Sequence, residues 1–217
     1  MSFCSVRLLI PVPVMVVAIL CSCASSQLPA MSQPHAAMIA IDMTLKQPLG
    51  DVRSKPNTVY FAKVDGDNGL LQNKTIRANY VKDGRAYLLN AGPGTYVAVA
   101  AYYSPPMLGM RMDSITYLSK ELVEKSKTTI EEGEVGFMGS FEVTQSTWSD
   151  QADEVQVHYQ NLLARRESKG ITVEYLNNFT SYRGLPGTSG NEENARNSFI
   201  QSARKDFAGS VWAPLVN

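Results

Sequence analysis

Apolar and polar residues alternate with a period of two along most of the chain between His35 and Thr144. This period is typical of β-strands that bury one face. It is clearest at residues 39–45 and 135–143, at the two ends of this region. Between them, runs of β-forming residues predict further strands at 58–64, 76–81, 85–89, 96–103, 115–122 and 127–130. The pattern therefore predicts a mainly β domain of about seven or eight strands.

Three turn signals separate these strands. Residues 65–69, DGDNG, predict a turn after the strand at 58–64. Asp83-Gly84 favours a type I′ hairpin, because both residues tolerate positive φ. Residues 92–94, GPG, predict a turn before 96–103, a strand that is apolar on both faces. A strand of that kind belongs at the centre of the sheet or beneath another layer.

The apolar period changes to that of a helix after Trp148. Ser149 or Asp150 is expected to start a first helix that ends before Gly170, with His158 facing solvent; its apolar face is Ala152, Val155, Tyr159 and Leu162. The segment 171–176 is compatible with strand or helix. A second helix is predicted at 192–207, with a stripe made of Ala195, Phe199, Ala203 and Phe207. We expect both stripes to pack on the sheet or on each other, and partner binding is the alternative.

The hairpin signal around residues 92–94 also carries a family resemblance. A leucine-containing strand, a Pro-Gly turn and Thr-Tyr-Val-Ala-Val resemble a recurring hairpin of transthyretin-like and carboxypeptidase-regulatory-like domains; the matching residues are Leu88, Leu89, Pro93, Gly94, Tyr96, Val97 and Val99. The resemblance implies a Greek-key β-sandwich, here with the two C-terminal helices packed on it. It also implies a binding or spacer module rather than a particular chemistry.

The N-terminus is typical of an exported protein. Arg7 precedes an apolar run at 8–20 that is shorter than the roughly 20 residues of a membrane-spanning helix and is interrupted by Pro11 and Pro13. This is the pattern of a cleaved signal peptide. A retained anchor helix and ordinary cleavage near Ala24 are the alternatives.

The end of the apolar run, Leu20-Cys21-Ser22-Cys23, resembles the bacterial lipobox, in which an aliphatic and a small residue precede an invariant cysteine. Cys23 fits this spacing, and Cys21 does not, because the bulky Leu20 would directly precede it. The resemblance implies cleavage before Cys23, a thioether-linked diacylglycerol on that cysteine, and a fatty acid such as palmitate on its amino group. Ala24 follows where an inner-membrane lipoprotein commonly has Asp, so the resemblance implies the outer membrane of a Gram-negative envelope.

These signals divide the chain into four parts. They are a lipoprotein signal peptide at 1–22, a lipidated flexible tether at 23–36, a β-sandwich at 37–145, and a helical C-terminal extension at 146–217. Cleavage would remove Cys4 and Cys21 and leave one cysteine, so the exported domain would hold together without a disulfide.

Charge and motifs change this picture little. Lysine and arginine number 20 and aspartate and glutamate also 20, so no basic excess favours a nucleic acid as partner. The run at 65–76 has Leu70 and Ile76 where a calcium loop needs Gly at its sixth and Glu at its twelfth position. Ser202–Lys205 lacks the other elements of penicillin-recognising enzymes. His35 and His158 show no zinc spacing. We therefore predict no cofactor and no catalysis.

One segment suggests metal chemistry. Met107, Met110 and Met112 lie within six residues between two predicted strands, and M-x-x-M-x-M resembles methionine-rich periplasmic Cu(I) sites. Packing of the methionines under their own loop, or contact with a partner or lipid, are the alternatives. The sequence thus predicts a structural or partner-binding envelope module anchored in membrane lipid through Cys23, with an envelope protein or polymer as partner. Metal or small-ligand binding, and an enzyme acting on envelope polymers, are the alternative functions.

Overall fold

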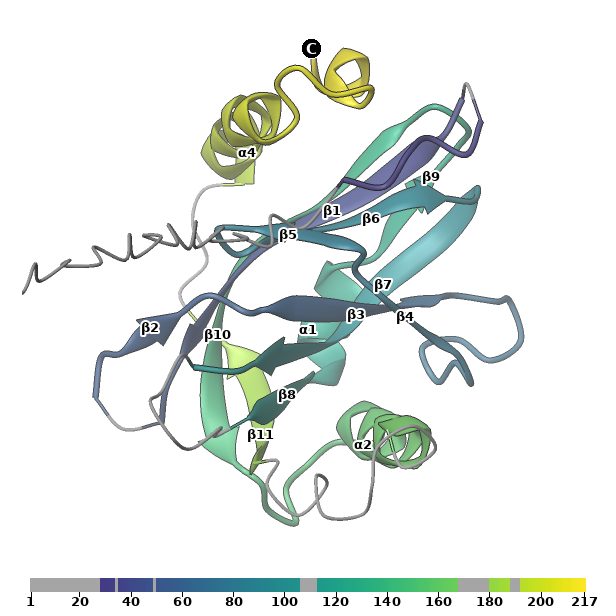
Figure 1. Cartoon of the computed structure of the whole chain (residues 1–217). Coiled ribbons are helices and arrows are strands. Elements are labelled where there is room, and N and C mark those ends of the chain that lie inside the picture. The colour runs from purple at the N-terminus through teal and green to yellow at the C-terminus, as the bar shows by residue number, and fades with distance from the viewer. Residues whose placement is uncertain (1–27, 34, 49, 106–112, 168–179, 188–191) are drawn as a thin grey trace, which may run out of the picture.

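The computed structural model describes residues 28–33, 35–48, 50–105, 113–167, 180–187 and 192–217 (Figure 1). The strands in these ranges are β1 (Ala37–Lys46), β2 (Arg53–Ser54), β3 (Thr58–Lys63), β4 (Thr75–Arg77), β5 (Tyr80–Lys82), β6 (Arg85–Ala91), β7 (Gly94–Tyr103), β8 (Ser114–Leu118), β9 (Thr128–Ile130), β10 (Val135–Thr147) and β11 (Thr180–Pro186). The helices are α1 (Lys120–Lys125), α2 (Glu154–Glu167), α4 (Glu192–Asp206) and the short 3₁₀ helix η1 (Ala213–Val216). The mainly β prediction is therefore confirmed.

All these strands belong to one mixed sheet. The main path runs β4-β3-β7-β8-β11-β10-β1-β6-β5, while β2 pairs with β1 and β9 pairs with β7. The ladders β1–β10 and β8–β11 are parallel, and the other ladders are antiparallel. The predicted strand count of about seven or eight was too low. The pairing found forms a single mixed sheet. It bears out neither a Greek-key order nor two packed sheets, and both remain predictions.

The sheet curls around its main apolar cluster. One face of β1 supplies Ile39, Ile41, Met43 and Leu45 to this cluster, and distant strands such as β3 and β7 supply others, among them Phe61 and Val99. Strand β7 is buried on both faces along its middle, as its two-sided apolar sequence predicted. Helices α1 and α2 add Leu122, Val123, Val155, Tyr159 and Leu163 to the cluster, and both contact β7 and β8.

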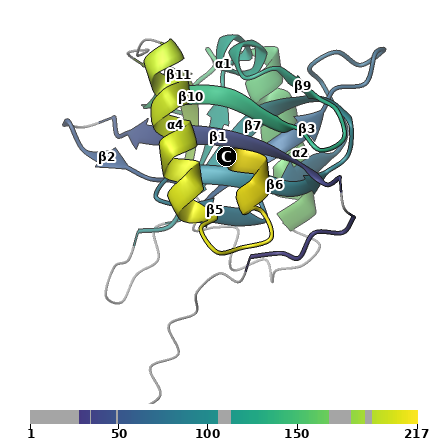
Figure 2. The same ribbon diagram turned by 90° about the horizontal axis from the view of Figure 1, so that it is seen from above.

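A second apolar cluster lies on the opposite face of β1. Met38 and Ala40 alternate with the inward residues and meet Tyr87 and Leu89 of β6. Helix α4 covers this face with the predicted stripe, of which Phe199, Ala203 and Phe207 are buried. Phe199 stacks on Phe137 with ring centroids 4.2 Å apart. Helices α4 and α2 therefore lie on opposite sides of the curled sheet (Figures 1 and 2).

Several local elements differ from the sequence-based expectation. The predicted strand at 115–122 ends at Leu118, and Ser119 then caps the helix α1. The predicted helical extension also contains β11, which lies in the sheet between β8 and β10. The predicted hairpin at residues 92–94 turns as expected, but β6 and β7 do not pair with each other and occupy separate places in the strand order.

The Asp83-Gly84 prediction is confirmed: φ is 50° at Asp83 and 82° at Gly84, and β5 pairs with β6 across this turn. As for membrane passage, none of the helices within the described ranges combines the length and apolarity needed to cross a bilayer.

Candidate functional site

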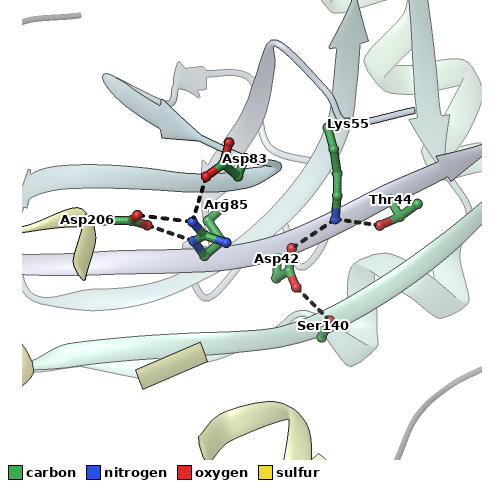
Figure 3. Close-up of polar contacts among 7 residues, drawn as sticks. All are labelled: Asp42, Thr44, Lys55, Asp83, Arg85, Ser140 and Asp206. Atoms are coloured by element: carbon green, nitrogen blue, oxygen red, sulfur yellow. Dashed lines mark hydrogen bonds and ion pairs between the residues drawn. The ribbon is translucent and has the colours of Figure 1, made fainter. Parts of the chain in front are cut away.

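A polar cluster occupies the outer face of β1, next to the surface that α4 covers (Figure 3). Asp42 points to the same face as Met38 and Ala40, and its partner across the β1–β10 ladder is Ser140. The Ser140 hydroxyl donates to Asp42 Oδ2 at 3.1 Å. Lys55 Nζ lies 3.7 Å from Asp42 Oδ1 and donates to Thr44 Oγ1 at 2.8 Å. We call Asp42, Thr44, Lys55 and Ser140 the Asp42 cluster.

The Asp42 cluster holds the connection between β2 and β3, which carries Lys55, against the sheet. The side chains of Asp42 and Lys55 are 30% and 50% exposed, and Ser140 is exposed as well. The Lys55 stem crosses the hairpin so closely that a Cβ on Gly84 would lie 2.4 Å from Lys55 Cδ. A solvent-exposed arrangement of this kind suits charge pairing or polar contact with a partner better than proton transfer in a water-excluded site.

A second polar group, the Asp206 cluster, joins α4 to β6. The Asp206 side chain is only 2% exposed and accepts from Arg85 Nε at 2.7 Å, from an Arg85 terminal nitrogen at 3.0 Å and from the Tyr87 hydroxyl at 2.7 Å. These hydrogen bonds raise the pKa of Arg85. Burial raises the pKa of Tyr87, and the carboxylate beside it raises it further. Every strong acceptor position on Asp206 is thus engaged within the fold, which indicates a structural clamp.

A hollow of about 410 Å³ lies beside the loop between β3 and β4. Its lining consists of Lys63, Asp65, Asn68, Gln72, Asn73, Lys74 and Ile76. Gln72 shapes the loop, because its Nε2 donates to the Gly69 carbonyl at 2.5 Å. Lys63 Nζ donates to the Pro93 carbonyl at 2.6 Å and lies 5.7 Å from the centroid of the Tyr96 ring. The hollow is large enough for a small molecule.

Helix α2 braces this loop through two aromatic side chains. The Tyr159 hydroxyl donates to the Leu70 carbonyl at 2.6 Å and accepts from the Gln72 amide at 3.3 Å. His158 Nε2 lies 2.7 Å from the Gln72 carbonyl oxygen. His158 is therefore half-buried against the loop, and the prediction that it faces solvent was wrong. No local motif signalled this contact, because its partners lie 86 residues apart.

Residues 28–33, which precede β1, are packed on the domain. We call residues 28–33 the docking segment. Its Pro29 carbonyl accepts from Trp212 Nε1 at 2.7 Å, and its Ala30 carbonyl accepts from Asn90 Nδ2 at 2.9 Å. Leu28 and Met31 pack against the second apolar cluster, which α4 covers. The docking segment falls within the predicted tether at 23–36, and this part of it contacts the fold.

The site residues predicted from sequence, Cys23, Met107, Met110 and Met112, lie outside the described residues. The methionine segment connects β7 to β8, which pair up to Tyr103 opposite Ser114. Asp113, directly after this segment, is 3% exposed, and its Oδ1 has no hydrogen-bond partner. Within the part of the chain that the structure describes, no three His, Cys, Asp or Glu side chains gather as a metal site.

Comparisons with known proteins leave the family open. No protein-family model matches the chain, and comparisons with curated proteins and with solved structures find no significant match.

Proposed function

We propose that this protein is a lipid-anchored lipoprotein of the outer membrane that serves as a structural or partner-binding module of the cell envelope. The observation that carries the proposal is the lipobox-like Leu20-Cys21-Ser22-Cys23 at the end of a signal-peptide-like apolar run. Two or three acyl chains at Cys23 would hold the domain durably, because each buried methylene contributes about 0.8 kcal/mol.

Features of the described domain agree with a module of this kind. The domain is built around two apolar clusters, as an exported domain without a disulfide requires. In the Asp206 and Asp42 clusters, buried and half-buried charged side chains form ion pairs with each other inside the domain. An envelope protein or polymer is the partner we propose.

The likeness to transthyretin-like and carboxypeptidase-regulatory-like domains is part of this proposal. The chain passes from β6 to β7 through Pro93-Gly94 without pairing the two strands, as a connection between facing halves of a sandwich would. Residues from both strands enter the same apolar cluster. A Greek-key sandwich with spacer or binding function is therefore the arrangement we propose for the curled sheet.

Mass spectrometry of the protein purified from its own membranes tests the anchor. We expect a chain that starts at Cys23 and carries diacylglycerol and an amide-linked fatty acid. The variant Cys23→Ala should leave the membrane fraction, whereas Cys21→Ala should remain there, since Cys21 does not fit the lipobox spacing. An unmodified start at another residue, or an intact leader, would refute the proposal.

Binding of Cu(I) through Met107, Met110 and Met112 is a second candidate function. The observation that favours it is the placement of three thioether-bearing residues in the β7–β8 connection. Titration of the domain with Cu(I) in competition with a chromogenic chelator tests it. We expect saturable binding that is lost when the three methionines are replaced by leucine, and binding no tighter than that of free methionine would exclude the site.

A further inference from the structure

We propose that the end of the molecule formed by the docking segment and the C-terminal residues 209–216 lies directly against the lipid bilayer. This surface would make the domain's main contact with lipid headgroups. The inference rests on the proposed acylation of Cys23 and adds an orientation to it.

The first step is the reach of the chain between lipid and domain. The docking segment begins at Leu28, five residues after Cys23, and an extended chain spans at most about 3.5 Å per residue. Leu28 therefore lies within about 17 Å of the acylated cysteine. The chain left after removal of residues 1–22 has 217 − 22 = 195 residues. A compact domain of that size is roughly 40 Å across, so its far side cannot reach the membrane surface while Leu28 is docked.

The second step is that the docking segment is fastened at more than one point. Trp212 Nε1 donates to the Pro29 carbonyl, and Trp212 itself is fully buried. Asn90 binds the segment twice, because its Nδ2 donates to the Ala30 carbonyl and its Oδ1 accepts from the Ser32 amide at 2.8 Å. Releasing the segment would leave the Trp212 indole N–H without its acceptor in a buried place, which opposes undocking.

The third step is the character of the surface beside this attachment point. Val211, next to Trp212, is 60% exposed, the highest value among the exposed large apolar side chains of the described residues. Leu215 and Leu28 are partly buried in the same cluster. The nearby Arg204 binds the Val216 carbonyl at 2.9 Å. An exposed apolar side chain and a cation held on the same C-terminal segment suit the boundary between acyl chains and anionic headgroups.

The opposite side of the molecule provides a matched reference position. Val157 on α2 is 41% exposed, and α2 lies across the curled sheet from α4 and the C-terminus in both views (Figures 1 and 2). If the docking segment sets the orientation, Val157 faces away from the bilayer. Val211 and Val157 are both exposed valines, so the same substitution can be made at each with little disturbance of packing.

Fluorescence quenching in vesicles tests the inference. The variants Val211→Cys and Val157→Cys each have one free thiol once Cys23 is acylated and the leader removed. Each lipidated variant is labelled with a fluorophore and incorporated into phosphatidylethanolamine–phosphatidylglycerol vesicles that contain a headgroup spin-labelled lipid. We expect several-fold stronger quenching at position 211 than at position 157. A flexible Gly/Ser insertion of about 20 residues after Ser26, which spans roughly 25 Å, should reduce this difference.

The outcomes separate this inference from the proposed function. Equal quenching at the two positions, with acylation of Cys23 verified by mass spectrometry, overturns the orientation and leaves the anchor intact. Stronger quenching at position 157 also overturns it. An unmodified Cys23 overturns both proposals.

Discussion

The carboxylate of Asp206 is the most completely engaged charged group among the described ion pairs. It accepts three hydrogen bonds from Arg85 and Tyr87 and is shielded from solvent. Asp206→Ala should lower the free energy of unfolding by about 3 kcal/mol, because it leaves the largely buried Arg85 guanidinium with only the exposed Asp83 carboxylate as an ionic partner. Urea unfolding followed by circular dichroism measures this loss.

An exposed pair on α1 is the control for Asp206. Lys125 Nζ and Glu121 Oε1 are 2.7 Å apart, but both side chains are more than half exposed. Glu121→Ala should change the free energy of unfolding by no more than about 0.5 kcal/mol. Similar losses for Glu121→Ala and Asp206→Ala would contradict the role assigned to the Asp206 cluster.

Ionisation of Tyr159 should lower the free energy of unfolding of the domain at alkaline pH. Burial raises the pKa of Tyr159 to about 12, although the Gln72 amide opposes this shift. The unfolded chain releases this proton near its ordinary pKa of about 10, and the folded protein keeps it. The contribution of Tyr159 is therefore complete below pH 10 and is lost as pH rises from 10 to 12.

The variant Tyr159→Phe tests this dependence. At neutral pH it should cost about 1–2 kcal/mol, because the Leu70 carbonyl loses its donor. Between pH 10 and 12 its free energy of unfolding should fall less steeply than that of the wild type. Parallel pH profiles for the two proteins would show that Tyr159 ionises as readily in the fold as in the unfolded chain.

Sequence patterns could not identify the polar contacts of these residues. Asp206 and Arg85 are 121 positions apart, and Tyr159 and Leu70 are 89 apart, so only the folded sheet brings them together. His158 was misplaced for the same reason, since no neighbouring residue in the chain signals its contact with Gln72. By contrast, the burial of Val155, Tyr159 and Phe199 was predictable, because an apolar period reports which face of an element is covered.

At the scale of elements, the β5–β6 hairpin depends on glycine at its second turn position. Gly84 has φ of 82°, and a Cβ there would lie 2.4 Å from Lys55 Cδ and 2.9 Å from the Met43 carbonyl oxygen. Gly84→Ala should therefore lower the free energy of unfolding by roughly 2 kcal/mol. Gly66 is the matched control, because a Cβ there meets nothing within 4 Å. Thermal unfolding of the two variants should show a loss only for Gly84→Ala.

Elements with strong local signals were predictable, and those created by tertiary pairing were not. Asp83-Gly84 encodes its turn, and the stripe from Ala195 to Phe207 encodes α4. The helix α1 was missed because its six residues follow directly on a run of β-formers. Strand β11 contains Gly184 and ends in Pro186, which resemble a loop. It becomes a strand because β8 and β10 supply hydrogen bonds on both sides.

At the scale of the whole molecule, the docking segment should stabilise the domain as well as position it. Deletion of residues 28–33, with Cys23 retained, removes the acceptor of Trp212 Nε1 and the apolar contacts of Leu28 and Met31. We expect the free energy of unfolding to fall by about 2 kcal/mol. The sequence concealed this role, because small residues and prolines are typical of tethers. An unchanged denaturation midpoint would show that the segment only rests on the surface.

The position of β11 also determines when folding can finish. It lies near the middle of the strand order, and its partners in β8 begin 66 positions earlier in the chain (180 − 114). Until residues 180–186 have been synthesised, the two halves of the sheet have no bridge on this path. Such a topology relies on contacts between residues far apart in the chain, which slows folding and delays cooperative closure until β11 is available. A nascent chain therefore stays open along this path, and the arrival of residues 180–186 acts as the trigger for compaction.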